Sequence, residues 1–257
     1  MNLQPENLPN ILHPYLDKIS ATILPTVTLQ LRSNDALTVW QSKIGGEPYL
    51  PLDTAYPLDS NGNPLALLAQ FNFVEIPSLP NFPDKGILQF YIAADDLYGM
   101  NFDDQQQQSG FRVLYFDHVI EDTSQLRQDF SEFELSEEDY LPFTGQYSVQ
   151  FKLEQQPISL SDHEFNIGDG TDEFYNAYGE TFLAMGHRLS GYPYFTQSDP
   201  RGDKKNIQDY ILLFQLDTDD AENEIMWGDS GVGNFFIHPE DLKKRDFSKV
   251  FYNWDCC

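Results

Sequence analysis

The sequence predicts an α+β fold that is internally duplicated, with a mainly antiparallel β-sheet and covering helices. Three blocks of residues recur in one register, each with an offset of 145 positions: residues 46–49 as 191–194, 67–70 as 212–215, and 86–92 as 231–237. Three blocks without a gap are hard to produce by chance. We therefore interpret the chain as two pseudo-symmetric repeats.

The 257 residues fit a single duplicated domain. We expect an N-terminal helix at about residues 5–20, repeat one at about 26–116, an acidic inter-repeat segment at about 117–142, and repeat two at about 171–257. The inter-repeat segment carries too many apolar residues for a purely solvated linker, so we expect it to pack along the sheet with its acidic side outward.

Two stretches have the period of amphipathic helices. Residues 5–20 place apolar side chains three and four positions apart, with Pro14 inside the pattern, where it kinks a helix or begins a new one. Phe174, Tyr178, Phe182 and Met185 form a similar stretch. Helices of this kind cover one face of a sheet.

The strands are predicted from alternation and from short apolar runs. Residues 26–31 alternate at period two. Each Gly-x-Pro-Tyr block is a turn, because glycine permits a positive φ and proline presets the bend. Apolar runs predict further strands at residues 65–73, 87–92, 111–116, 210–216, 232–237 and 250–254. Residues 103–108 are expected to be a polar loop tip with no core to bury.

The charge of the chain is strongly acidic, with 15 Lys and Arg against 41 Asp and Glu, a formal net charge of −26. Such a surface repels nucleic acids and anionic membranes, because binding them depends on Lys and Arg. It attracts cations or a basic protein partner. We therefore expect no nucleic-acid and no membrane partner, and the oligomeric state stays open.

Targeting signals and disulfides are absent from the pattern. The first residues show no signal peptide, and no apolar run approaches the ~18 residues that a membrane span needs. The two cysteines, Cys256 and Cys257, are adjacent and close no useful loop, which leaves a terminal redox or metal-binding pair as the alternative. We expect a cytoplasmic protein.

Gln70 and Gln215 are the most informative polar pair, because each interrupts an apolar run at an equivalent position. A buried amide needs all its hydrogen bonds, so each glutamine either ties down a neighbouring segment or helps to line a ligand cleft between the repeats. In the second interpretation the remaining polar and aromatic lining comes from Tyr49, Tyr194, Asp217, Trp227 and Asp229.

Residues 217–224 carry five carboxylates and are the candidate metal loop, with Asp217, Asp219 and Glu222 as ligands and Ca²⁺ as the candidate ion. The EF-hand order is absent, and exposed acidic loops are common in so acidic a chain. The string Gly-Asp-Ser-Gly at residues 228–231 matches the surroundings of a protease serine, but no histidine context marks a base for Ser230. We predict no catalytic residues and no resident cofactor.

Several motifs in a fixed order resemble the YwqG-like family of bacterial proteins, which carry a domain of unknown function. The resemblance rests on residues 45–51, 68–72, 85–90, 111–116, 213–217, 226–231 and 252–255. It implies an α+β fold with an internal duplication and no established reaction. The genomic neighbourhood of some relatives implies an immunity or partner-binding role.

Together these patterns favour a non-enzymatic protein-binding module with an acidic surface, of immunity type, that binds a basic protein. The alternative is a small-ligand or metal-binding protein, or an enzyme, that uses a cleft between the two repeats.

Overall fold

The computed structural model describes residues 3–133, 140–219 and 223–257. Its main element is one ten-stranded sheet with the order β10-β9-β8-β7-β1-β6-β2-β3-β4-β5. All neighbouring strands are antiparallel. The strands are β1 (Leu24–Ser33), β2 (Lys43–Gly45), β3 (Ala66–Asn72), β4 (Ile87–Ile92), β5 (Phe111–Phe116), β6 (Gln146–Gln156), β7 (Arg188–Leu189), β8 (Ile211–Asp217), β9 (Val232–Ile237) and β10 (Phe251–Asp255).

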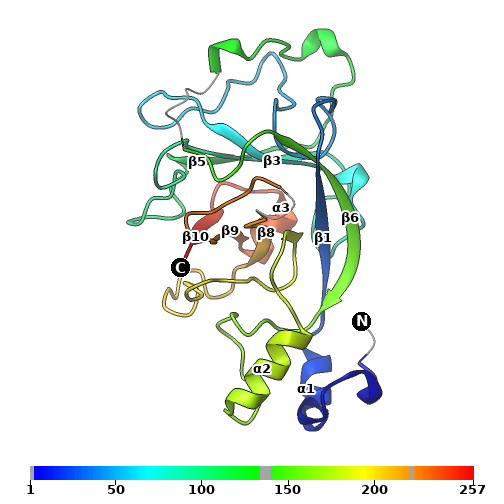
Figure 1. Cartoon of the computed structure of the whole chain (residues 1–257). Coiled ribbons are helices and arrows are strands. Elements are labelled where there is room, and N and C mark those ends of the chain that lie inside the picture. Colours follow the sequence, from blue (N-terminus) through cyan, green and yellow to red (C-terminus); the bar gives the residue numbers. More distant parts are fainter. Residues whose placement is uncertain (1–2, 134–139, 220–222) are drawn as a thin grey trace.

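The predicted fold class is wrong. The chain does not show an internally duplicated α+β fold but a mainly β protein in which one sheet curls on itself (Figure 1). The physical reason is the long antiparallel pair β1 and β6, which runs in register from Leu24 opposite Gln156 to Ser33 opposite Tyr147. Strand β6 pairs with β2 on its other edge, and β1 pairs with β7. This pair therefore joins both groups of strands into one continuous sheet.

The expected covering helices are also wrong. Residues 5–20 form the short 3-10 helices η1 (Pro5–Asn7) and η2 (Asn10–Tyr15), with Pro14 inside η2, and then α1 (Leu16–Ala21). Helix α2 (Asp172–Thr181) packs on this N-terminal segment, and the rings of Tyr15 and Phe174 lie 4.9 Å apart. In Figure 1 both helices lie at one end of the molecule. They bury their apolar sides against each other rather than across the sheet.

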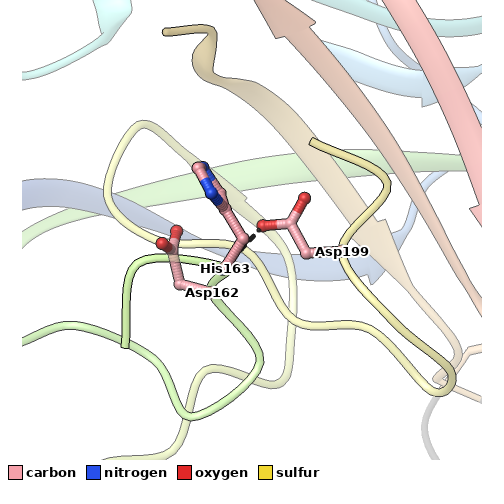
Figure 2. A group of neighbouring side chains, drawn as sticks. All are labelled: Asp162, His163 and Asp199. Atoms are coloured by element: carbon pink, nitrogen blue, oxygen red, sulfur yellow. Dashed lines mark hydrogen bonds between the residues drawn. The ribbon is translucent and has the colours of Figure 1, made fainter. Parts of the chain in front are cut away.

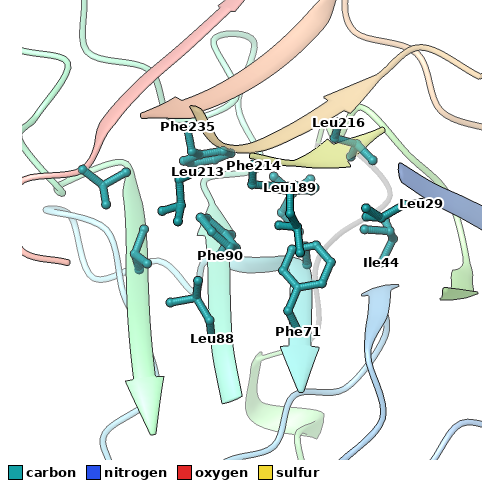
Figure 3. Close-up of a cluster of buried hydrophobic side chains, with 14 of the residues drawn as sticks. Leu29, Ile44, Phe71, Leu88, Phe90, Leu189, Leu213, Phe214, Leu216 and Phe235 are labelled. Atoms are coloured by element: carbon teal, nitrogen blue, oxygen red, sulfur yellow. The ribbon is translucent and has the colours of Figure 1, made fainter. Parts of the chain in front are cut away.

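The main core lies between the two groups of strands, as Figure 3 shows. The ring centroids of Phe71 on β3 and Phe214 on β8 are 4.9 Å apart, and those of Phe90 on β4 and Phe235 on β9 are also 4.9 Å apart. Each fully buried phenylalanine contributes about 1.5–3 kcal/mol through removal of apolar surface from water. The two groups of strands therefore share one interior.

The loop at residues 103–108 connects the two edge strands of the curled sheet. The Tyr252 N–H donates to the Gln105 carbonyl at 3.0 Å, and Gln105 Nε2 donates to Asn253 Oδ1 at 2.7 Å. On the other side the Val113 N–H donates to Gln108 Oε1 at 2.9 Å. The expectation of a polar tip with nothing to bury is wrong, because Gln105 is 7% exposed and satisfies edge groups that would otherwise be free to pair with other chains.

The helices of the described residues include α3 (Pro239–Lys244), which lies between β9 and β10 in sequence. The remaining 3-10 helices are η3 (Phe73–Glu75), η4 (Thr123–Gln125) and η5 (Ser131–Phe133). Within the described residues we find no helix with the length and apolar character needed to cross a membrane.

Candidate functional site

A cavity of about 440 Å³ lies where several loops meet beside the beginning of β1. Its walls come from the loop after β6, the turn after β7 and the segment that leads into β8, with residues of two other loops at the rim. Its polar and aromatic lining includes Asp162, His163, Glu164, Tyr192, Arg201, Asp209 and Tyr210. This cavity combines charged, aromatic and hydrogen-bonding groups in one place.

Arg201 forms the floor of the cavity together with two carboxylates. Its Nη2 lies 2.7 Å from Asp162 Oδ2 and 2.6 Å from Asp199 Oδ2, and its Nε lies 3.0 Å from Asp199 Oδ1. The guanidinium stacks 4.7 Å above the ring of Phe236. Desolvation lowers the pKa of Arg201, but the hydrogen bonds and charge of Asp199 and Asp162 outweigh it, so the pKa is raised above its usual value. All three charged groups are buried.

Two tight turns hold these carboxylates in place. Asp199 Oδ1 accepts the backbone N–H of Arg201 at 2.9 Å, and Asp162 Oδ1 accepts that of Glu164 at 3.0 Å. Asp side chains favour such turns because they can bond the backbone two residues further on. The same residues that shape the two loops therefore carry the charge of the cavity floor.

His163 lies between the two carboxylates (Figure 2). Its backbone N–H donates to Asp199 Oδ2 at 3.1 Å. Ligand atoms of Asp162, His163 and Asp199 lie within 4.8 Å of one another, so the three side chains could hold a metal ion. Because the guanidinium of Arg201 already bonds to both carboxylates, an ion here competes with Arg201.

The rim of the cavity adds further negative charge and aromatic surface. Glu164 and Asp209 are exposed carboxylates. In the walls Tyr192 is partly buried and Tyr210 is buried. Burial raises the pKa of Tyr192 to about 12, and the charges of Asp162 and Glu164 act in the same direction, so its hydroxyl stays neutral near pH 7. The cavity therefore presents an acidic interior with neutral aromatic walls.

Gln70 and its predicted partner Tyr49 lie on the outer side of β3. Gln70 Oε1 accepts the Tyr49 N–H at 2.8 Å, while its Nε2 donates to the carbonyls of Val39 at 2.8 Å and Gln41 at 2.9 Å. Gln89 on β4 donates to the same Oε1 at 2.8 Å. Gln70 is fully buried and ties the segment before β3 to the sheet.

Gln215 makes similar bonds on β8. Its Oε1 accepts the Tyr194 N–H at 2.8 Å, and its Nε2 donates to the Gly186 carbonyl at 2.7 Å. The strand neighbours of both glutamines, Phe71 and Phe214, point into the shared core. The glutamines therefore point away from that core, each into its own outer layer, and the structure does not bring them together in one cleft.

The predicted aromatic and acidic partners are likewise dispersed. Trp227 is fully buried with its ring edge-on to Tyr98 at 5.5 Å, and Gly233 leaves room for it, since a Cβ there would lie 2.4 Å from the Trp227 ring. Asp229 is exposed in the following turn. Ser230 is also exposed, and among the described residues no histidine bonds to its hydroxyl.

The candidate calcium loop is only partly described. Asp217 is 4% exposed and accepts the Gly186 N–H at 2.6 Å, and burial raises the pKa of its carboxyl. Asp219 Oδ2 lies 3.5 Å from His187 Nε2 and accepts from Asn223 Nδ2 at 2.5 Å. Glu222 lies outside the described residues. Calcium binding by this loop stays a prediction.

Sequence reasoning missed the residues of the cavity. Asp162 and Asp199 are far apart along the chain, and no motif spacing joins them. The available signal was local: Asp-His-Glu and Asp-Pro-Arg are turn sequences, and Arg201 is one of few basic residues in an acidic chain. Only folding places the two turns beside each other.

The fold and cavity define a mainly β protein with a buried Asp–Arg–Asp network beneath an acidic pocket. Residues 42–256 match the family described as Domain of unknown function (DUF1963), and the chain belongs to this family. A search of the curated proteins finds no match. The predicted membership of a family of unknown function is thus confirmed, while the narrower YwqG-like assignment stays a prediction.

Proposed function

We propose that the chain is a non-enzymatic binding protein whose acidic cavity receives a lysine or arginine side chain of a basic protein partner. The observation that carries this proposal is the charge of the cavity lining: Asp162, Glu164 and Asp209 contribute three carboxylates against one arginine. Asp199 does not line the cavity, but it adds a fourth carboxylate behind Arg201, so the one guanidinium neutralises only part of the total charge.

The two rim carboxylates are the groups available to a ligand. No ion pair between described residues includes Glu164 or Asp209. The deeper Asp162 and Asp199 are held by Arg201 and by their own turns. A cationic head group entering the cavity therefore meets a preorganised negative floor and two unpaired carboxylates, an arrangement that lowers the reorganisation cost of binding.

The size and walls of the cavity suit one side chain. Small-ligand sites are commonly about 300–1,000 Å³, and the cavity lies near the lower end of that range with a volume of about 440 Å³. Aromatic faces attract ammonium and guanidinium groups, and Tyr192 and Tyr210 supply such faces. The net charge of −26 increases the rate of encounter with a basic partner.

Isothermal titration calorimetry tests this proposal by measuring the affinity of the protein for a five-residue peptide that carries one lysine. The same peptide with norleucine in place of the lysine is the uncharged comparison. The variant E164Q/D209N removes the rim charges, and D35N/E121Q removes two exposed charges elsewhere and serves as the matched control. We expect E164Q/D209N to weaken lysine-peptide binding about twofold or more, because each exposed pair contributes roughly 0.2–1 kcal/mol.

The control variant is expected to bind nearly as tightly as the wild type at the same salt concentration. Raising the salt concentration from about 50 to 300 mM should weaken binding of the lysine peptide and leave binding of the norleucine peptide unaffected. Equal binding of the two peptides, or equal losses in both variants, contradicts the proposal.

A second candidate function, divalent-cation binding, is favoured by the spacing of Asp162, His163 and Asp199. Thermal melts with millimolar Zn²⁺ or Mn²⁺ test it, because an ion that binds only the folded state raises the melting temperature. Loss of that increase in H163A, but not in H118A at an exposed histidine, would support a metal site. An unchanged melting temperature in the wild type would exclude it for these ions.

A further inference from the structure

We infer that a groove beside the edge strand β5 binds an anionic group, a phosphate or a carboxylate, of a ligand. The groove has a volume of about 550 Å³ and lies between β5 and residues 245–248. Two arginines line it, Arg112 on β5 and Arg245 after α3. This inference does not depend on the acidic cavity.

Arg245 is fixed by backbone carbonyls and not by a carboxylate. Its Nη2 donates to the Phe82 carbonyl at 3.0 Å, and its Nη1 donates to the carbonyls of Leu242, at 2.8 Å, and Asn81. Its backbone adopts φ 60°, the left-handed conformation that ends helix α3. These bonds hold the guanidinium in a fixed position at the groove.

Arg112 carries a donor that lacks an acceptor. Its Nε is buried and has no hydrogen-bond partner among the described residues. Because this Nε is not accessible, a ligand oxygen can reach only the terminal nitrogens Nη1 and Nη2, which make no hydrogen bond to a described residue. Neither Arg112 nor Arg245 takes part in an ion pair between described residues, although acidic residues outnumber basic ones 41 to 15.

The other polar groups of the groove are occupied. Gln108 uses Oε1 for the Val113 N–H and Nε2 for the Phe247 carbonyl. The hydroxyl of Ser248 is also in use, because its Oγ donates to Asp246 Oδ1 at 2.6 Å. The rings of Tyr115 and Phe247 lie 5.5 Å apart and form an apolar wall.

The terminal nitrogens of Arg112 and the two remaining N–H groups of Arg245 are thus the charged donors left for a ligand. Guanidinium groups match phosphate and carboxylate oxygens with paired hydrogen bonds. The chemistry of the groove therefore selects a compact anion, and the adjoining apolar wall suits the body of a larger molecule that carries it.

The test uses the full chain labelled with ¹⁵N and follows the Nε–H signals of its arginines by NMR during titration with inorganic phosphate or with succinate. We expect a saturable shift of the Arg112 signal with at least one of the two anions, at constant ionic strength set with sodium chloride. A stronger response to phosphate identifies a phosphorylated ligand, and a stronger response to succinate identifies a carboxylate ligand.

Two variants complete the test. R112Q removes the Arg112 guanidinium and is expected to weaken anion binding about tenfold, whereas R32Q changes an exposed arginine on β1 and should bind as the wild type does. The wild-type titration remains decisive even if R112Q is less stable. No saturable shift with either anion, or equal affinity in R112Q and R32Q, overturns the inference.

Discussion

Arg201 and Asp199 form a buried two-point ion pair, with Nη2 2.6 Å from Oδ2 and Nε 3.0 Å from Oδ1. Asp162 approaches the same guanidinium from a different loop at 2.7 Å. The pair therefore fastens two turns that are distant in sequence and sets the floor of the acidic cavity.

Replacing Arg201 by methionine should destabilise the fold by about 3–5 kcal/mol at pH 7, because it leaves two buried carboxylates without a compensating charge. Urea unfolding of R201M measures this loss. The matched control is K152M, which breaks the exposed pair between Lys152 and Glu154 and should cost less than about 1 kcal/mol. Similar costs for the two variants would show that the buried network is not structurally important.

The burial of Lys43 should make the free energy of unfolding depend on pH. Burial lowers the pKa of Lys43 from 10.5 to about 8, although Glu47 and Glu75 oppose the shift. Between these values the unfolded chain binds more protons than the folded one, so the contribution of Lys43 to stability rises with pH. The loss of stability caused by K43M should therefore increase between pH 8 and 10.5, by at most about 3 kcal/mol.

Urea unfolding of the wild type and K43M across this pH range tests the dependence. The difference between the two proteins is the relevant quantity, because burial raises the pKa of several tyrosines and these lower the stability of both proteins at high pH. A difference that stays constant from pH 8 to 10.5 would contradict a buried, charged Lys43.

Replacing Gln70 by leucine should be strongly destabilising. The substitution leaves the Tyr49 N–H and the carbonyls of Val39 and Gln41 without their partner. Each unsatisfied buried group costs about 1–3 kcal/mol. Q215L should behave alike, whereas Q30L at an exposed position of β1 should change stability by less than about 0.5 kcal/mol. If thermal melts showed that Q30L lowers the melting temperature as much as Q70L does, the structural role of Gln70 would be refuted.

Gln105 should protect the edge of β10 from pairing with other chains. Q105A removes the bonds to the Tyr252 carbonyl and Asn253 Oδ1, with an expected loss of about 1–2 kcal/mol and faster aggregation on heating. Light scattering during a thermal ramp measures both effects. The control Q107A removes only an exposed bond to Asn101, and equal aggregation of the two variants would count against edge protection.

Much of the strand content could be predicted from local pattern, and the fold class could not. The strands at residues 87–92, 111–116 and 232–237 are confirmed with the predicted bounds. Strand β6 was missed, although Tyr147, Val149, Phe151 and Leu153 alternate with polar residues. Because β6 joins the two groups of strands, its omission led to separate repeats instead of one curled sheet.

The candidate site was less accessible to sequence reasoning than the strands. Gln70 and Gln215 are buried as expected, because a lone polar residue in an apolar run is a local signal. The cavity depends on a long-range meeting of Asp162 with Arg201, which periodicity and motif spacing do not encode. The excess of acidic residues favoured a cationic partner, but only the folded chain shows which of these residues line the cavity.

The proposed function is tested most directly by a crystal structure of the protein grown with the lysine-bearing peptide at saturating concentration. We predict that the lysine ammonium lies in the acidic cavity, within hydrogen-bond distance of Glu164 or Asp209 and beside the ring of Tyr192 or Tyr210. A peptide bound elsewhere on the surface, with no lysine side chain in this cavity, would contradict the proposed function.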